Sequence, residues 1–462
     1  MPVLNETEIM EDVQRFDKLP LPRQVLILSL CACTRIQLKR DQKTEAEEEV
    51  PVNTYLHAPL TGRGILAAAK RLRRQFDIVD NVDLDAIVTS YFLFTAHGNL
   101  EEHRHALFLL NEAITMTFTL GLDNEETYAS LPASEREMRR RIFWLLFVTE
   151  RTYALQRRQP VMLRSTISKP QVIDSDCPVL MHDFVNHIRL FELLPPTLYD
   201  WRPSGDPLQQ QVSAVALSQR VADMLCTVQA GDSMLESQQF DTLVTQQWLR
   251  VSMWRLAFGQ VSKQLRWHSG STNAKIPFDA GRSIMGHLEA VSSTNKDCHG
   301  ISLVSVSRAD LISMQLLTGH EQEQKLFDIG VSLSDASLIT PPTSFFELGP
   351  VDLLYSIVKC LGHIRGCKSP LLPELLKHCG GLLPYSTPAP QLSMSSTLYE
   401  SPVDSPCRLL MDGGETASTE EPSPDGSWHQ DENRITDFEE IGHFINELSC
   451  EPPAFDECSS VG

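Results

Sequence analysis

Residues 135–160 read EREMRRRIFWLLFVTERTYALQRRQP, and this stretch decides the fold. Its centre, residues 142–147, is apolar on every side, which is typical of a helix buried among several other helices. Ser134 and Glu137 form a capping-box pattern at its start. The stretch therefore predicts a buried helix over about residues 135–156, acting as core scaffold, with the Trp144 side chain inside the protein.

Helical periodicity continues on both sides of this stretch. Candidate helices lie at residues 19–40, 63–76, 84–97, 99–120, 209–228, 241–267, 279–292, 302–327 and 345–364. Short polar or proline-bearing connections separate them, and the sequence has no run of alternating strands and no fixed-period repeat. We therefore expect an all-α fold, in which one multi-helix domain spans residues 1–383.

Segment 99–120 has the clearest helix signals. Asn99 is expected to cap its start, and Glu102 stands three residues further on. Gly121 followed by Leu122 is typical of a left-handed helix stop with a hydrophobic contact back onto the helix. The pattern predicts both ends of this helix.

Charge divides the chain into a nearly neutral body and an acidic end. The net charge of the 462 residues is −20, and residues 391–462 contain sixteen Asp and Glu against two Arg. This balance argues against general affinity for DNA phosphates or anionic membranes. Ser, Thr, Pro, Gly and acidic residues dominate after about residue 383, so residues 384–434 predict a disordered linker.

Neither membrane insertion nor export is expected. The longest apolar run, residues 142–148, is too short to cross a bilayer, and residues 1–19 are acidic and lack the apolar core of a signal peptide. The eleven cysteines are then most simply reduced thiols.

These cysteines do not form a zinc pattern. Structural zinc sites usually use paired C-x2-C units, and no such unit occurs in the sequence. Cys31 and Cys33 are separated by one residue in a predicted helix, so they face different sides, and Cys360 and Cys367 have no partner pair. Buried apolar thiols are the favoured interpretation.

Three histidines, His97, His103 and His105, lie close together in the sequence. His103 and His105 flank Arg104, which is not the i, i+4 pair of a helical zinc protease. The polar face of a helix is the favoured interpretation. We therefore expect no metal ligand and no cofactor-binding residue in this chain.

Two basic clusters have to be weighed as DNA contacts. They consist of Lys70, Arg71, Arg73 and Arg74, and of Arg136, Arg139, Arg140 and Arg141. The second cluster runs straight into the apolar core, so we expect a solvated first turn that pairs with Glu135 and Glu137 rather than with phosphates.

Local signs of catalysis are missing from the sequence. It has no glycine-rich phosphate loop, no G-x-S-x-G elbow and no aspartate-rich metal motif. Asp80, Asp83 and Asp85 have the wrong spacing for such a motif and precede a predicted helix. We therefore expect a protein that is not an enzyme and has no catalytic residues.

The acidic end, residues 435–462, carries one amphipathic segment. Residues 435–448 read ITDFEEIGHFINEL, with Thr436 and Glu439 in a capping pattern and acids beside an apolar stripe. The stripe consists of Phe438, Ile441, Phe444, Ile445 and Leu448. Such a segment in an acidic tail indicates an activation motif that folds into a coactivator groove. A terminal helix docked on the protein's own core is the alternative.

At this point the sequence resembles a known family. Residues 84–123 contain AIVTSYFLFTAHGN and then ALFLLNEAITMTFTLGLD, and residues 135–160 contain RRIFW, the Glu150–Arg151 pair and a final proline. Both stretches are similar to the middle homology region of fungal zinc-cluster transcription factors, with the second closest to the starch and maltose utilisation activators. The resemblance is strongest over residues 24–171.

The resemblance implies a nuclear regulator of RNA polymerase II genes for carbohydrate utilisation or secondary metabolism. Its partners would be coactivators and a second copy or a related factor. The family's amino-terminal zinc cluster, six cysteines in two C-x2-C-x6-C arms, has no counterpart here. Zinc would then belong to a missing module, either through a truncated gene model or a true absence, and DNA would bind only weakly.

Two other functions stay open from the sequence. The chain could be a DNA-binding-deficient partner that inhibits full-length relatives by pairing with them. It could also be an all-helical enzyme with a pocket that no local motif reveals.

Overall fold

The computed structural model describes residues 3–37, 61–171, 178–199, 207–228, 236–259, 275–290, 308–338, 349–363, 369, 371–380 and 382. Within these residues the regular structure is helical, and none of them is in a β-strand. The all-α prediction is therefore confirmed. The expected linker at residues 384–434 and the segment 435–462 lie outside the described residues.

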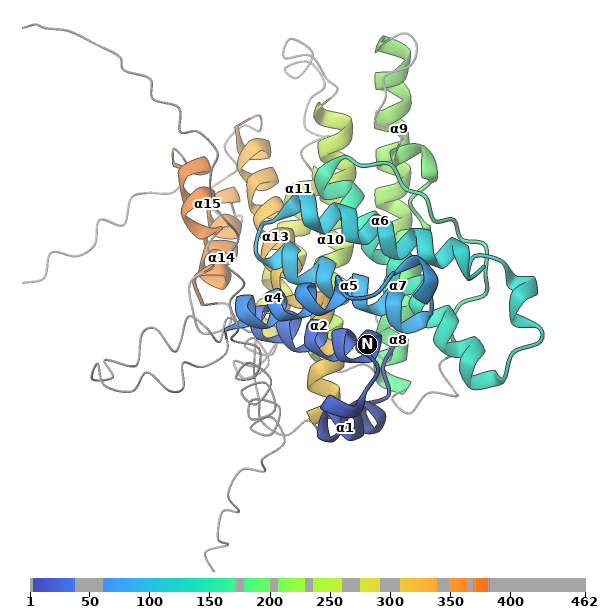
Figure 1. Ribbon diagram of the computed structural model, residues 1–462. Helices are drawn as coiled ribbons and strands as arrows, with labels where there is room; N and C mark the ends of the chain where they lie inside the picture. Colours follow the sequence, from blue (N-terminus) through green and yellow to red (C-terminus); the bar gives the residue numbers. More distant parts are fainter. Residues whose placement is uncertain are drawn as a thin grey trace, which may run out of the picture.

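The helices of the amino-terminal third form one group (Figure 1). They are α1 (Glu6–Gln14), α2 (Leu21–Gln37), α4 (Gly62–Arg73), α5 (Leu84–Asn99), α6 (His103–Thr119) and α7 (Ala133–Arg157). Helix α2 packs on α4 and α5, and α5 packs on α6, so α5 lies at the centre of this group.

The second group follows in the chain. Its helices are α8 (Pro178–Glu192), α9 (Pro207–Leu225), α10 (Glu236–Gly259), α11 (Lys275–Ala290), α13 (Arg308–Ser337), α14 (Pro350–His363) and α15 (Leu372–His378). Helix α10 contacts α8, α9, α11 and α13, and it lies in the middle of this group (Figure 1). Contacts between α2 and α13, and between α7 and α8, join the two groups.

Helix α7 is buried as its sequence predicts. The side chains from Ile142 to Phe147 are at most 1% exposed, and Trp144 is fully buried. The indole N–H of Trp144 donates a hydrogen bond to the carbonyl of Ser168 at 3.0 Å. The largest apolar side chain of the stretch thus lies in the core with its polar group satisfied.

Two expected helix caps are wrong. Asn99 is the last residue of α5, and its amide donates to the Thr95 carbonyl, while α6 begins only at His103. Helix α7 begins at Ala133 after Pro132, with no side-chain cap, and the carboxylate of Glu137 binds elsewhere. Asn99 and Glu137 fit a cap pattern in the sequence, but each side chain makes its hydrogen bond with another partner.

The stop after α6 is confirmed. Gly121 has φ of +64°, and the N–H of Leu122 donates to the Thr117 carbonyl at 3.0 Å. Leu122 is fully buried. Glycine adopts this left-handed backbone without the steric cost that a Cβ atom brings, so the turn can be tight.

Helix α8 was not predicted, nor were α1 and α15. Its sequence, PVLMHDFVNHIRLFE, places Met181, Phe184, Val185, Ile188 and Phe191 at helical spacing, and all five side chains are buried, so the periodicity could have revealed it. This omission matters because α8 supplies two residues of a buried polar cluster.

Candidate functional site

Residues 159–171 form a strap that runs along α7, and side chains of α7 fix it. Glu150 accepts hydrogen bonds from the backbone N–H groups of Met162 at 2.6 Å and Leu163 at 3.0 Å. Arg151 donates to the carbonyl of Leu163 at 2.9 Å. Together with Trp144, the Glu150–Arg151 pair therefore closes the strap onto the helix.

The electrostatics of this pair follow from burial. Burial raises the pKa of Glu150, although the two strap amides oppose the shift. Burial also lowers the pKa of Arg151 to about 10. The guanidinium of Arg151 stacks on the Phe147 ring with its central carbon 3.3 Å from the ring centre. Such pairing of buried charges with backbone and ring partners is typical of scaffold.

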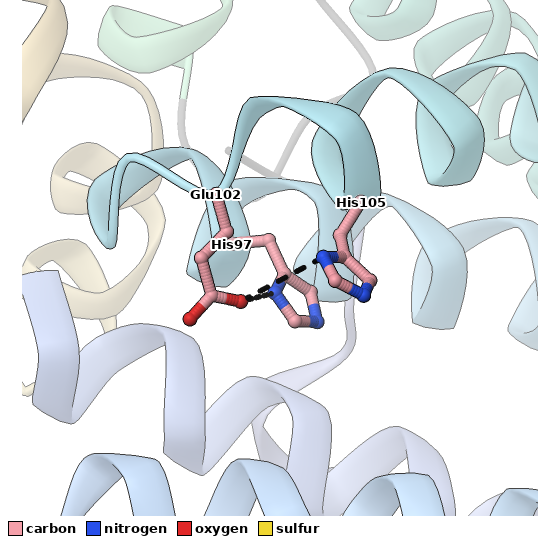
Figure 2. A group of neighbouring side chains, drawn as sticks. All are labelled: His97, Glu102 and His105. Atoms are coloured by element: carbon pink, nitrogen blue, oxygen red, sulfur yellow. Dashed lines mark hydrogen bonds and ion pairs between the residues drawn. The ribbon is translucent and has the colours of Figure 1, made fainter. Parts of the chain in front are cut away.

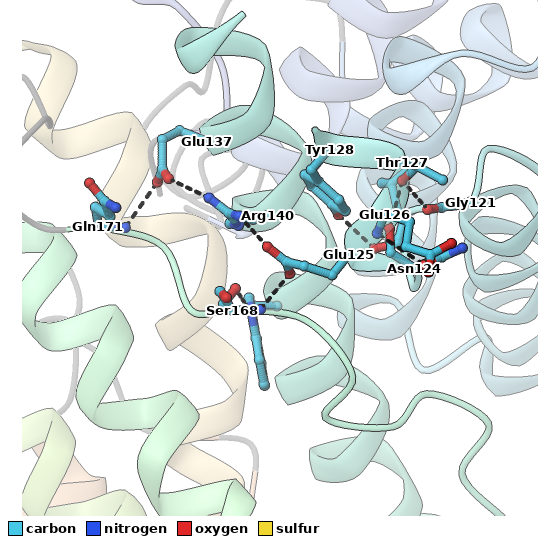
Figure 3. Close-up of polar contacts among 12 residues, drawn as sticks. Gly121, Asn124, Glu125, Glu126, Thr127, Tyr128, Glu137, Arg140, Ser168 and Gln171 are labelled. Atoms are coloured by element: carbon cyan, nitrogen blue, oxygen red, sulfur yellow. Dashed lines mark hydrogen bonds and ion pairs between the residues drawn. The ribbon is translucent and has the colours of Figure 1, made fainter. Parts of the chain in front are cut away.

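Arg140 holds the other end of the strap (Figure 3). Its guanidinium binds Glu125, and it donates to Glu137 at 3.2 Å. Glu125 accepts from the Ser168 N–H at 2.8 Å, and Glu137 accepts from the Gln171 N–H at 2.9 Å. One arginine thus orients two carboxylates that each bind the strap.

The basic clusters are largely engaged in such contacts. Arg139 pairs with Glu135 and Arg140 with Glu137, which confirms the expected pairing. The expected solvated turn is wrong for Arg140, because its side chain is only 13% exposed. In the first cluster, Arg73 binds Glu112 and donates to Ser90 at 2.8 Å.

A histidine corner forms where α5 meets α6 (Figure 2). Nδ1 of His97 lies 2.6 Å from Oε2 of Glu102, and Nδ1 of His105 lies 3.9 Å from the same oxygen. The two imidazole rings stack, with centres 4.8 Å apart and planes 15° apart. His103 is not part of the corner, because its ring contacts Arg157.

The corner differs from the expected polar helix face. His97 is 2% exposed and comes from α5, whereas His105 is 60% exposed and comes from α6. Burial lowers the pKa of His97, against the opposing hydrogen bond to Glu102, and so favours the neutral imidazole. A neutral imidazole beside a carboxylate is the protonation state that metal ligands need.

A second polar cluster is buried between α8, α10 and α13. Asp183 and Asp241 approach the two ring nitrogens of His187 at 3.4 and 3.7 Å. The hydroxyl of Thr245 lies 3.4 Å from Nε2 of His187 and accepts from the ammonium of Lys325 at 2.9 Å. We call Asp183, His187, Asp241 and Lys325 the buried charge cluster.

The charge balance of this cluster depends on His187. Burial by itself lowers the pKa of His187, but the charges of Asp183 and Asp241 outweigh it and raise the pKa to about 9. With the imidazole protonated, two anions meet two cations, and the cluster is neutral. Sequence reasoning missed it, because only the Asp183–His187 spacing of four residues is visible locally.

The activation motif and the cysteines are the other residues that the sequence singled out. The proposed activation motif, Phe438, Ile441, Phe444, Ile445 and Leu448, lies outside the described residues. So does Cys367, while Cys31 is half-buried and Cys33 buried on α2. None of the described helices is both long and apolar enough to span a membrane.

Comparison with known proteins places these elements in a family. The model of the fungal specific transcription factor domain matches residues 21–259, just over half of the chain, from α2 to the end of α10. No solved structure gives a significant match.

Several curated relatives are named for sugar utilisation or for its regulation. The chain is 23% identical over 300 residues to the probable sucrose utilization protein SUC1 of Candida albicans, covering 62% of this chain and 60% of that protein. It is 26% identical over 278 residues to the maltose fermentation regulatory protein MAL13 of Saccharomyces cerevisiae, covering 59% and 55%. For MAL63 of Saccharomyces cerevisiae, with the same description, the identity is 23% over 325 residues, covering 70% and 64%. The chain thus spans less than two thirds of the length of these relatives.

Proposed function

Because the chain belongs to the family of proteins with the fungal specific transcription factor domain, we propose that it regulates transcription of genes for carbohydrate utilisation. The observation that carries the proposal is the match over residues 21–259, together with relatives described as a probable sucrose utilization protein and a maltose fermentation regulatory protein. A role in secondary metabolism is a second possibility within the same proposal. The expected place of action is the nucleus.

The architecture supports a regulatory rather than a chemical role for the family motif. Of its most recognisable side chains, Glu150 and Arg151 bind the backbone of the strap, and Arg140 binds Glu137, which in turn accepts from the Gln171 N–H. Side chains that hold backbone in this way stabilise a scaffold and leave no reactive group exposed. The proposal therefore treats the helical domain as the part that receives and transmits a regulatory signal.

The proposal assigns output to the acidic end of the chain. Coactivators would bind the stripe of residues 435–448, since acids keep such a tail soluble and steer it while apolar side chains supply contact area. DNA contact by this chain would be weak and without sequence preference, because its net charge is −20. Pairing with a second copy or a related factor completes the proposal.

Deleting the gene from the source organism tests the function. Transcripts would be compared between wild type and deletion on glucose, maltose and sucrose. We expect genes for disaccharide uptake and hydrolysis to change in the deletion when maltose or sucrose is the carbon source. If these transcripts stay unchanged and those of a secondary-metabolite cluster change, the result would favour regulation of secondary metabolism over regulation of carbohydrate utilisation.

A reporter assay tests the tail separately. Residues 421–462 would be fused to an unrelated DNA-binding domain, with and without the changes Phe438→Ala, Ile441→Ala and Phe444→Ala. Strong reporter output that the triple variant loses is the expected result. Equal output from both fusions would assign activation to charge alone.

A further inference from the structure

The histidine corner brings together three side chains that suit a transition metal. His97 closes the end of α5, Glu102 precedes α6, and His105 lies in the first turn of α6. One ligand atom from each of the three residues lies within 4.8 Å of the other two. We propose that the corner binds one first-row divalent cation such as Zn²⁺ through His97, Glu102 and His105.

The separations between the ligand atoms are close to those of a metal site, and the His105 ring has to turn out of the stack so that both ring planes meet at the ion. Ligand atoms around a tetrahedral Zn²⁺ at about 2.0–2.1 Å are about 3.3 Å apart. The distances from Oε2 of Glu102 to the two Nδ1 atoms are 2.6 and 3.9 Å, so one pair opens and the other closes by about 0.6–0.7 Å. Figure 2 shows the carboxylate and a nitrogen of each ring facing one another.

The three ligands differ in how far they are exposed to solvent. His97 is 2% exposed and is held in the core, whereas His105 is 60% exposed and can swing toward the ion. Solvent at the exposed side supplies water for the remaining coordination position. Arg63 donates to the other carboxylate oxygen of Glu102 at 3.1 Å, which orients that carboxylate as outer partners of metal ligands do.

The ligand set selects the class of ion. Two imidazoles and one carboxylate suit zinc and its first-row neighbours, whereas Mg²⁺ and Ca²⁺ take oxygen ligands. Binding at Nδ1 of His97 requires the ring proton to move to Nε2. The carbonyl end of α5 favours the cation and the amide end of α6 opposes it, so the two helix termini offset each other.

The buried charge cluster does not compete for this assignment. Asp183, His187 and Asp241 also lie close enough for a metal. There, however, Lys325 already supplies a buried positive charge through Thr245, and protonated His187 supplies a second. A divalent cation would add charge to a neutral buried cluster, which is costly in a low-dielectric interior.

Binding of Zn²⁺ to the full-length, reduced chain tests the proposal. Isothermal titration would compare wild type with His105→Gln, which removes an exposed ligand without opening the core. His287→Gln is the matched control, because His287 is an exposed histidine on α11. We expect wild type and His287→Gln to bind one more equivalent than His105→Gln, or to bind it at least about 10-fold more tightly.

Stability supplies a second readout. Because Zn²⁺ would bind only the folded corner, it should raise the melting temperature of wild type and His287→Gln but not of His105→Gln. Excess Mg²⁺ should not displace the bound Zn²⁺. The proposal is overturned if all three proteins bind Zn²⁺ with the same stoichiometry and affinity, if His287→Gln loses as much as His105→Gln, or if Mg²⁺ displaces the ion.

Discussion

Replacing His187 by glutamine should remove a pH dependence of stability that the native chain shows in mildly alkaline solution. The pKa of His187 is raised from 6.5 to about 9 by Asp183 and Asp241, which outweigh the effect of burial. A histidine with a raised pKa stabilises the fold fully below its unfolded pKa. That stability is lost as the pH rises from about 6.5 through about 9, because the unfolded chain releases its proton first.

The size of the effect follows from the shift. A difference of one pKa unit corresponds to 1.36 kcal/mol, so the shift of His187 is worth about 3 kcal/mol. The side chain is 13% exposed, and its partners Asp183 and Asp241 are 20% and 8% exposed, so solvent screens these charges little. For a domain of this size the loss is a large part of the total stability.

Urea unfolding from about pH 6 to about pH 10 measures this dependence. Between these two pH values, the free energy of unfolding of wild type should fall by about 3 kcal/mol more than that of His187→Gln. At about pH 6, His187→Gln should be the less stable of the two. The exposed-histidine variant His287→Gln should follow wild type. Equal slopes for wild type and His187→Gln would refute the account of the buried charge cluster and place the proton elsewhere.

Three further predictions concern the helical core and strap. Trp144→Ala should cost about 3–5 kcal/mol in thermal melts, since the indole is fully buried and binds the strap. Gly121→Ala should cost about 1–2 kcal/mol, because its φ is +64° and an added Cβ would lie 3.1 Å from Thr127. Arg140→Leu leaves the carboxylates of Glu125 and Glu137 without their cation, so limited proteolysis should cut the strap faster. An unchanged cleavage rate would show that Trp144 and the Glu150–Arg151 pair suffice.

The sequence predicts the helices better than their ends. Residues 142–147 specify a buried helix by composition alone, and Gly121 specifies a stop because few other residues adopt its backbone. The cap at Ser134 failed for a tertiary reason, because Glu137 binds the strap. The cap at Asn99 failed for a local reason, because α5 runs on through Asn99 and its amide donates to the Thr95 carbonyl.

The polar clusters were hidden for a tertiary reason as well. Histidines 97, 103 and 105 look like one group in the sequence, yet His103 and His105 are two residues apart on α6 and face different sides, so only His105 reaches His97. The turn after α5 depends on Glu101, whose φ of +60° is unusual for a residue other than glycine. The buried charge cluster needs α8, α10 and α13 together, so only the folded chain brings Asp241 and Lys325 to His187.

The most direct test of the central claim is whether the tethered chain changes transcription. All 462 residues would be fused to an unrelated DNA-binding domain in a yeast reporter strain, and reporter transcript would be measured on glucose and on maltose. The account predicts output that differs from the DNA-binding domain alone and changes with the carbon source. A fusion that is present in the nucleus at normal level, yet leaves reporter transcript unchanged on both sugars, would contradict it.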